Sequence, residues 1–289
     1  MQEIVVFGGA GFLGTYLVEE LLRDGHRVTV ADQRPLDLPG VTNVSCDILD
    51  PETVNSVIPD AADAVYNLAG FANLDLAVEQ PRATLELNVM GNLNILVACA
   101  ERRVKRFVYA SSAYAMNDKG SFYGISKLTS EKLTEEFYKK HRLPYTILRY
   151  GSVYAERDVD NNYIFSVVKR AVETGRIVHS GDGEEIREYI HARDAARLSV
   201  QVLAPEFENQ HVILTGTERL RRIELFRMIE EILGKPINIQ LDKSGYHHHY
   251  RLTPYSFNPT MSKKLVANPH IDMGQGILEC IRALHDPNQ

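Results

Sequence analysis

Short apolar runs alternate with segments of helical periodicity over the first half of the chain. Apolar residues that recur at every third or fourth position predict helices over 12–23, 51–58, 79–102, 122–141 and 162–174. Continuous apolar runs predict strands at 4–7, 28–31, 43–46, 64–68, 106–110 and 145–148. Because the strands alternate with helices, the pattern predicts βαβ units and a doubly wound α/β fold, with a parallel sheet covered on both faces.

The pattern becomes irregular after residue 155. Ser180–Gly183 is a glycine-rich turn, residues 244–270 are rich in Pro, Asn and His, and one more strand is predicted at Val212–Thr215. We therefore expect a smaller, irregular α+β lobe over the carboxyl edge of the sheet, where open α/β sheets bind their ligands. The predicted sheet domain comprises residues 1–155 and about 192–216, and the predicted substrate lobe comprises 156–191 and 217–289.

Three glycines mark the junction between the first predicted strand and the first predicted helix. Gly8, Gly11 and Gly14 follow the apolar run Ile4–Phe7. Glycines at this spacing allow a sharp turn, bring backbone N–H groups close to a diphosphate and let the helix pack tightly on the strand. The sequence therefore predicts a dinucleotide-binding turn. Two further residues of this turn, Phe12 and Leu13, are expected to contact the cofactor.

A carboxylate closes the second predicted strand. Asp32 lies eighteen residues after Gly14, and an acid near this offset binds the hydroxyls of the adenosine ribose in dinucleotide-binding folds. Because a carboxylate repels a 2′-phosphate, Asp32 favours NAD over NADP. Arg34, two residues later, leaves NADP open as the alternative cofactor.

A hydroxyl, a phenol and an ammonium are predicted at one edge of the sheet. Tyr123 and Lys127 are four residues apart on a predicted helix, so they project from one face. Ser112 follows the strand predicted at 106–110. Such a set can remove the proton of a carbinol while hydride leaves to a nicotinamide, since the ammonium lowers the pKa of the Tyr123 phenol.

The chain resembles the extended short-chain dehydrogenase/reductases of the NAD-dependent epimerase/dehydratase family over nearly its whole length. The resemblance implies a Rossmann domain that binds NAD, with Ser112, Tyr123 and Lys127 as the catalytic residues. Tyr123 and Lys127 are also implied to contact the cofactor. The resemblance adds further cofactor contacts from Asp47, Ile48, Leu68, Ala69, Gly70, Asn88 and Tyr150.

The segment from Gly181 to His191 resembles the nucleotide-sugar signature of the same family. By this resemblance Arg187 and Arg251 clamp a diphosphate, and Asn162 contacts the phosphate or the base of a nucleotide sugar. Ser112 is implied to contact the sugar as well. The resemblance therefore implies a nucleotide-sugar substrate.

Two departures from the family pattern bear on the reaction. The segment between Ser112 and Tyr123 is short, and Ala113 and Tyr114 stand where related 4,6-dehydratases carry an Asp-Glu pair and related decarboxylases carry a Glu. Without an acid to protonate a leaving hydroxyl, elimination is disfavoured. We therefore expect an NAD-dependent nucleotide-sugar epimerase that transiently oxidises a ring hydroxyl, at C4, with Tyr123 as the base.

Two other functions are alternatives to epimerisation. The chain could act as an NAD(P)-dependent nucleotide-keto-sugar reductase or dehydrogenase, for which an exchanging NADPH would be natural. It could also be a non-catalytic, nucleotide-sensing member of the fold, although the intact Ser112, Tyr123 and Lys127 argue against this.

The composition argues against nucleic-acid and membrane partners and favours the cytoplasm. The net charge of −6 provides no basic field for a nucleic acid. The apolar runs are shorter than a membrane span, and the early first strand leaves no room for a signal peptide. We expect a cytoplasmic homodimer, paired through the helices at 79–102 and 122–141, with three reduced cysteines. No metal site is expected, because His247–His249 are consecutive and point in different directions.

Overall fold

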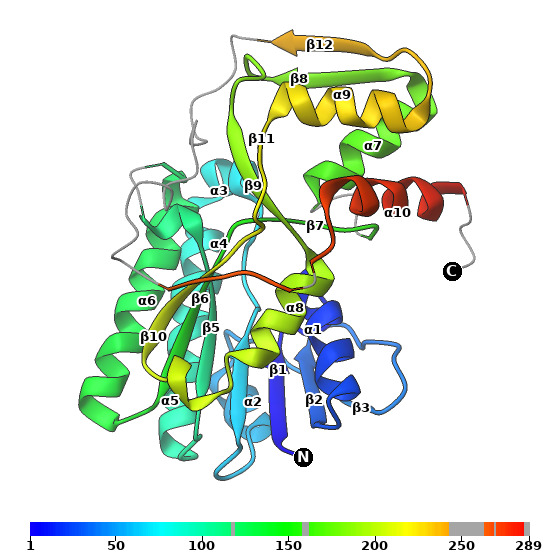
Figure 1. Cartoon of the computed structure of the whole chain (residues 1–289). Coiled ribbons are helices and arrows are strands. Elements are labelled where there is room, and N and C mark those ends of the chain that lie inside the picture. The colour runs from blue at the N-terminus through cyan, green and yellow to red at the C-terminus, as the bar shows by residue number, and fades with distance from the viewer. Residues whose placement is uncertain (117–118, 158–161, 243–262, 269, 286–289) are drawn as a thin grey trace.

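A computed structural model describes residues 1–116, 119–157, 162–242, 263–268 and 270–285 (Figure 1). The strands of its main sheet are β1 (Glu3–Phe7), β2 (Arg27–Asp32), β3 (Val41–Ser45), β4 (Ala64–Asn67), β5 (Phe107–Ser112), β6 (Tyr145–Tyr150), β10 (Gln210–Leu214) and β13 (Lys263–Leu265). They are arranged in the order β13-β10-β6-β5-β4-β1-β2-β3, and all neighbouring pairs are parallel. The predicted parallel sheet is therefore confirmed.

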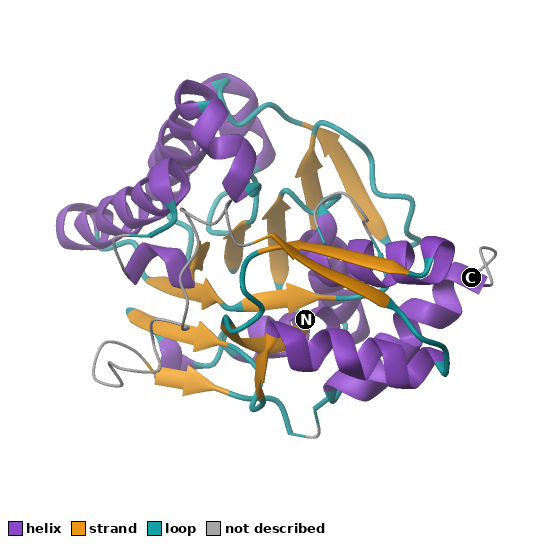
Figure 2. Cartoon of the chain, turned by 90° about the horizontal axis from the view of Figure 1, so that it is seen from above, coloured by secondary structure: helices purple, strands orange, loops and turns teal. Residues whose placement is uncertain are grey.

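Helices lie on both sides of this sheet (Figure 2). One face carries α1 (Phe12–Arg23) and α8 (Ala192–Gln201), which pack against each other. The elements of the other face are α2 (Pro51–Val57), α3 (Leu74–Glu79), α4 (Pro81–Leu85), the π-helical turn η1 (Glu86–Gly91), α5 (Asn92–Glu101) and α6 (Ser121–His141). Two short 3-10 turns are η2 (Ala113–Met116) and η3 (Pro205–Phe207). The arrangement is the doubly wound fold that the sequence predicts.

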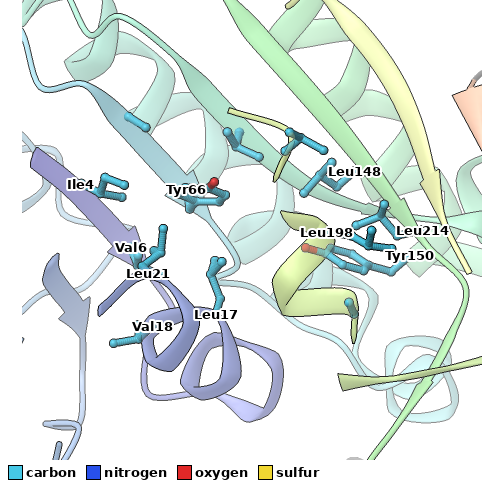
Figure 3. Close-up of a cluster of buried hydrophobic side chains, with 14 of the residues drawn as sticks. Ile4, Val6, Leu17, Val18, Leu21, Tyr66, Leu148, Tyr150, Leu198 and Leu214 are labelled. Carbon is cyan, nitrogen blue, oxygen red and sulfur yellow. The ribbon is translucent and has the colours of Figure 1, made fainter. Parts of the chain in front are cut away.

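Two cores form because successive strand residues point to opposite faces. Ile4 and Val6 pack toward α1 and α8, whereas Val5 and Phe7 pack toward α2 and α5. Figure 3 shows the first of these cores. Tyr150 belongs to it, and its hydroxyl lies 2.7 Å from the hydroxyl of Ser199 on α8.

The helix predicted over 79–102 is interrupted. Pro81 begins α4, and the π-helical turn η1 separates α4 from α5. Within the described part of the chain, the stretch Pro81–Glu101 is the one helical stretch long and apolar enough to cross a membrane by length and composition. It packs against α2 and α6, and a core helix has the same apolar composition.

A second lobe lies beyond the carboxyl edge of the main sheet, in the upper part of Figure 1. Its strands are β7 (Ser152–Tyr154), β8 (Arg176–Ser180), β9 (Ile186–His191), β11 (Arg219–Arg221) and β12 (Asn238–Asp242). Its helices are α7 (Tyr163–Thr174), α9 (Arg222–Leu233) and α10 (Met273–His285), which share a third core. One predicted boundary is wrong, because residues 263–265, expected in the lobe, return to the main sheet as β13 beside β10.

Candidate active site

The turn between β1 and α1 is shaped by its glycines. Gly8 has a φ of +76°, and a Cβ at this position would lie 2.5 Å from the backbone nitrogen of Ala69. A Cβ on Gly14 would overlap the carbonyl oxygen of Gly8. Gly11 begins α1 without a side-chain cap, which leaves the first N–H groups of the helix for an anion. The geometry fits the predicted dinucleotide turn.

A groove of about 260 Å³ lies beside this turn, at the carboxyl ends of β1, β2, β3 and β4. Its lining residues are Gly8, Gly11, Ala31, Asp32, Gln33, Arg34, Cys46, Ile48, Leu68, Ala69, Gly70 and Leu87. Half of the residues predicted to contact the cofactor are in this set: Gly8, Gly11, Asp32, Arg34, Ile48, Leu68, Ala69 and Gly70. The groove therefore lies where an open α/β sheet binds a dinucleotide.

Asp32 is held in the groove by backbone groups. Its Oδ2 accepts a hydrogen bond from the N–H of Ala10 at 3.1 Å, and its Oδ1 accepts one from the N–H of Arg34 at 3.1 Å. The first bond links the end of β2 to the glycine turn. Because a carboxylate has about four lone-pair sites, Asp32 keeps acceptor capacity for a ribose diol.

Three residues predicted to contact the cofactor have other partners. The exposed Asp47 accepts a hydrogen bond from the N–H of Leu49. Asn88 is buried in η1, and its amide bonds both the N–H and the carbonyl oxygen of Phe71. The hydroxyl of Tyr150 points into the core. Asn88 thus fixes the loop after β4, which borders the groove, and the side chain of Tyr150 does not line the groove.

The first turn of α1 also faces the protein interior. The ring of Phe12 meets the edge of the Tyr16 ring, with the ring centroids 6.0 Å apart. Leu13 packs against the core beneath α1. The side chains of Phe12 and Leu13 therefore pack on the core side of the glycine turn. The backbone of the turn, rather than these side chains, faces the groove.

Ser112, Tyr123 and Lys127 lie near the carboxyl end of β5. Ser112 is the last residue of β5, and Tyr123 and Lys127 occupy successive turns of α6. The Lys127 Nζ lies 5.7 Å from the centroid of the Tyr123 ring and donates to the carbonyl oxygen of Ala110 at 2.9 Å. This confirms that the phenol and the ammonium lie on one helix face.

Lys127 is buried at this edge. Burial disfavours its charge and lowers the pKa of Lys127 to about 8, although the carboxylate of Glu131 opposes the shift. The side chain is therefore an ammonium at neutral pH. It loses its charge in a mildly alkaline solution.

A buried ion pair lies directly behind Lys127. The carboxylate of Glu131 accepts from both Nε and Nη2 of Arg149, at 2.9 and 2.7 Å, and from the hydroxyl of Ser111 at 2.5 Å. The exposed fraction of the Glu131 side chain is 0%. Sequence reasoning missed this network. The available signal was the position of Glu131 four residues after Lys127, on the same face of α6.

The second lobe places buried polar groups around Arg187. Arg187 lies in β9 and is 2% exposed. Nearby, the His179 ring bonds Glu185 at 3.2 Å and the hydroxyl of Tyr163 at 2.9 Å. The guanidinium of Arg222 stacks 4.0 Å from the centroid of the Tyr163 ring. The lobe thus gathers cationic and aromatic groups of the kind that bind phosphates and bases.

Asn162 has a structural role in this lobe. It caps α7, because its side-chain oxygen accepts from the N–H of Phe165, and its amide donates to the carbonyl oxygens of Ala155 and Arg157. The predicted contact of Asn162 with the nucleotide sugar stays a prediction. Arg251 and His247–His249 lie outside the described residues.

One group of side chains in the described ranges has the spacing of metal ligands. The Nε2 of His191 lies 3.4 Å from Glu156 and 3.6 Å from Glu279. However, the Nδ1 of His191 accepts a hydrogen bond from the N–H of Arg193. In a neutral histidine the ring proton then lies on Nε2, the nitrogen that faces the two carboxylates, so this nitrogen has no lone pair for a metal. The guanidinium of Arg193 also pairs with both acids. We interpret the group as a charged contact that joins α8 to α10.

The fold and the glycine groove define a Rossmann-type nucleotide-binding protein. Comparison with known proteins specifies the family, because the NAD dependent epimerase/dehydratase family matches residues 4–215. The chain belongs to this family. Its cofactor is accordingly NAD, and it is an enzyme of the extended short-chain dehydrogenase/reductase kind.

Individual relatives cover nearly the whole chain. A bifunctional UDP-glucose and UDP-xylose 4-epimerase of Pisum sativum is 28% identical over 83% of this chain and 84% of its own length. A UDP-N-acetyl-α-D-glucosaminuronate decarboxylase of Bacillus cytotoxicus is 25% identical over 97% of each. The crystal structure of UDP-glucuronic acid 4-epimerase from Bacillus cereus, with UDP-glucuronic acid and NAD, has a TM-score of 0.84 at 21% identity and covers 98% of each chain. These relatives share the fold but differ in reaction.

Proposed function

We propose that this protein is an NAD-dependent nucleotide-sugar epimerase that transiently oxidises a ring hydroxyl at C4. The proposal is supported by the positions of Ser112 at the end of β5 and of Tyr123 and Lys127 on the adjacent α6, at the sheet edge that also bears the dinucleotide groove. The positions where dehydratases and decarboxylases of the family carry an acid hold Ala113 and Tyr114 instead. Epimerisation needs no such acid, whereas elimination requires one.

The side chains have distinct roles in this reaction. Tyr123, as the phenolate, takes the proton of the substrate hydroxyl and later returns it. Lys127 stabilises the phenolate by its positive charge. The Oγ of Ser112 accepts from the N–H of Tyr114 at 3.3 Å, so its own proton is directed elsewhere and can be donated to the substrate oxygen. NAD, when bound, supplies the site that holds the hydride between the two halves of the reaction.

The second candidate is an NAD(P)-dependent nucleotide-keto-sugar reductase. The specific observation in its favour is Arg34, which lines the groove beside Asp32 and could accept a 2′-phosphate. Titration of the protein with NAD and with NADP tests the NADP-dependent form of this candidate. We expect NAD to bind more tightly and Asp32→Ala to narrow the difference. Equal affinities, or a preference for NADP, would favour the reductase.

The direct test is incubation with a panel of UDP-, GDP-, CDP- and dTDP-linked sugars, with the products followed by NMR. We expect one stereoisomer to form without net NADH. Tyr123→Phe should retain the fold and NAD binding but lose at least about 10²-fold in turnover. A 4-keto-6-deoxy sugar, CO₂ or stoichiometric NADH would each reject the epimerase.

We also propose that two copies pair through the helices of the outer face. Apolar side chains that remain exposed lie on the stretch Pro81–Glu101 and on the adjacent α6: Leu85, Met90, Val97, Phe122, Ile125 and Leu128. Large apolar side chains that are exposed on neighbouring, packed helices support an interface on this face. Sedimentation equilibrium should give twice the monomer mass, and Ile125→Asp should give a monomer. A wild-type monomer at micromolar concentration would contradict the proposal.

A further inference from the structure

Among the described residues of the short segment between Ser112 and Tyr123, Tyr114 contacts both of them. Tyr114 lies in η2, directly after β5. Its backbone N–H donates to the Ser112 Oγ at 3.3 Å. Its ring meets the Tyr123 ring edge to face, with the centroids 6.2 Å apart and the planes at 74°. Tyr114 therefore contacts both the hydroxyl of Ser112 and the ring of Tyr123.

The start of α6 is built around Tyr114. Gly120 precedes the helix with a φ of +96°, and a Cβ on Gly120 would lie 2.7 Å from Cδ1 of the Tyr114 ring. A Cβ on Gly124 would lie 2.9 Å from the carbonyl oxygen of Tyr114. Both positions therefore need glycine for a close approach to the same residue. The ring of Tyr114 is fixed between the backbone at Gly120 and the ring of Tyr123.

The fixed ring limits where the phenol of Tyr123 can go. Tyr123 is half-buried at the edge of the site, so its side chain could leave the neighbourhood of Lys127 for solvent. An aromatic neighbour held edge to face favours one orientation of the ring. An aliphatic side chain of similar size would fill the space without this preference.

We propose that Tyr114 is a positioning residue for the reaction: its ring holds Tyr123 beside Lys127, and its N–H orients the Ser112 hydroxyl. The inference rests on the proposed function, because it assigns Tyr123 and Ser112 to proton transfer. Tyr114 itself transfers no proton. The aromatic ring, rather than the Tyr114 hydroxyl, supplies the constraint.

Three substitutions separate the ring from the hydroxyl and from simple bulk. Tyr114→Phe keeps the ring and should leave kcat within about threefold of the wild type. Tyr114→Leu keeps bulk but removes the ring, and should lower kcat about 10- to 100-fold while KM and NAD affinity change less than about threefold. Tyr114→Ala should lower kcat at least as much as Tyr114→Leu.

A matched control exists on the same helix. Tyr138 makes a similar edge-to-face pair with Tyr145, with the centroids 5.9 Å apart and the planes at 73°, near the other end of α6. Tyr138→Leu should leave kcat unchanged. Melting temperatures of all variants check that each is folded.

A second readout does not depend on turnover. Absorbance near 295 nm reports phenolate formation, and subtraction of a Tyr123→Phe titration isolates Tyr123. In the presence of NAD, the ionisation of Tyr123 should move to higher pH in Tyr114→Leu and stay in place in Tyr114→Phe.

The outcomes distinguish this inference from the proposed function. If no nucleotide sugar reacts with the wild type, the proposed function fails, and the titration of Tyr123 still tests the positioning. Unchanged kcat and unchanged Tyr123 ionisation in a folded Tyr114→Leu would overturn the inference. A large rise in KM in Tyr114→Phe would also overturn it, since the hydroxyl would then contact substrate.

Discussion

The dinucleotide groove is shaped by backbone atoms, whereas the polar cluster of the second lobe, which we propose as the substrate half of the site, is formed by side chains. At the dinucleotide groove the backbone makes the shape, because Gly8 and Gly14 bring main-chain atoms closer together than any Cβ permits. In the second lobe, side chains form the polar cluster: Arg187 is buried near His179, and the guanidinium of Arg222 lies over the ring of Tyr163. A backbone-built groove tolerates no added atom at these positions. A side-chain-built site loses a specific contact when one group is changed.

The largest expected effect is at the backbone-built half. Gly14→Ala places a methyl group against the carbonyl oxygen of Gly8, so the turn must open and NAD affinity should fall by at least about 100-fold. The measurement is calorimetric titration with NAD. Gly274→Ala on α10 is the control, because its Cβ would meet only the exposed side chain of Asp272, and it should bind NAD normally. Normal NAD binding by Gly14→Ala would show that the turn is not rigid.

Next in size is the loss of the buried ion pair behind Lys127. Glu131→Gln leaves the Arg149 guanidinium without a counter-charge and should lower the free energy of unfolding by about 3–5 kcal/mol. Urea titration measures this change. Glu136→Gln, at an exposed pair with Lys139 on the same helix, should change it by less than about 1 kcal/mol. Equal effects of the two substitutions would refute a structural role for the buried pair.

A smaller and more selective effect is expected from the side-chain-built half. Arg187→Met should weaken nucleotide-sugar binding by about 10- to 100-fold, the size of a lost hydrogen bond to a charged group, while NAD affinity stays the same. Separate titrations with the nucleotide sugar and with NAD provide the comparison. Arg219→Met, at a half-exposed arginine of the same lobe, is the control. An equal loss of nucleotide-sugar affinity and NAD affinity in Arg187→Met would mean that Arg187 does not act on the substrate alone.

The smallest effect is a pH dependence centred on Lys127. Because the pKa of Lys127 is about 8, its positive charge is present at pH 7 and is lost as the pH rises through 8. The value of kcat/KM, which reports groups of the free enzyme, should therefore fall on the alkaline side with a midpoint near pH 8. Since the pKa is lowered by folding, the unfolded chain binds more protons between pH 8 and 10.5, and stability should rise across that window. A profile that stays flat to pH 10 would contradict this account.

Features that depend on local spacing could be predicted from the sequence, whereas features that depend on distant contacts could not. The glycine turn, Asp32 and the pair of Tyr123 and Lys127 depend on local spacing, and the structure places all of them at one sheet edge. Local spacing also predicts the alternating strands and helices of the main sheet. These features need no knowledge of distant contacts.

The features that were missed depend on distant contacts. The pair of Glu131 and Arg149 joins α6 to β6, and β13 returns to the main sheet after the whole second lobe. The resemblance assigns ligand contacts to Asn88 and Asn162, and these stay predictions; it does not reveal the backbone groups that bond both amides in the structure. No local pattern reveals which partner a buried polar side chain takes.

The central claim is that one hydride leaves C4 of the sugar and returns to the same carbon. A nucleotide sugar carrying deuterium at C4, chosen from the substrates that the enzyme converts, tests this claim most directly. In ordinary water the epimerised product should retain the deuterium at C4, and its formation should be slowed relative to the unlabelled substrate. Loss of the label to solvent would contradict transient oxidation and indicate an exchangeable carbanion. A product labelled at another carbon would contradict the return of the hydride to C4, and an epimerised product formed without any isotope effect would contradict the assignment to C4.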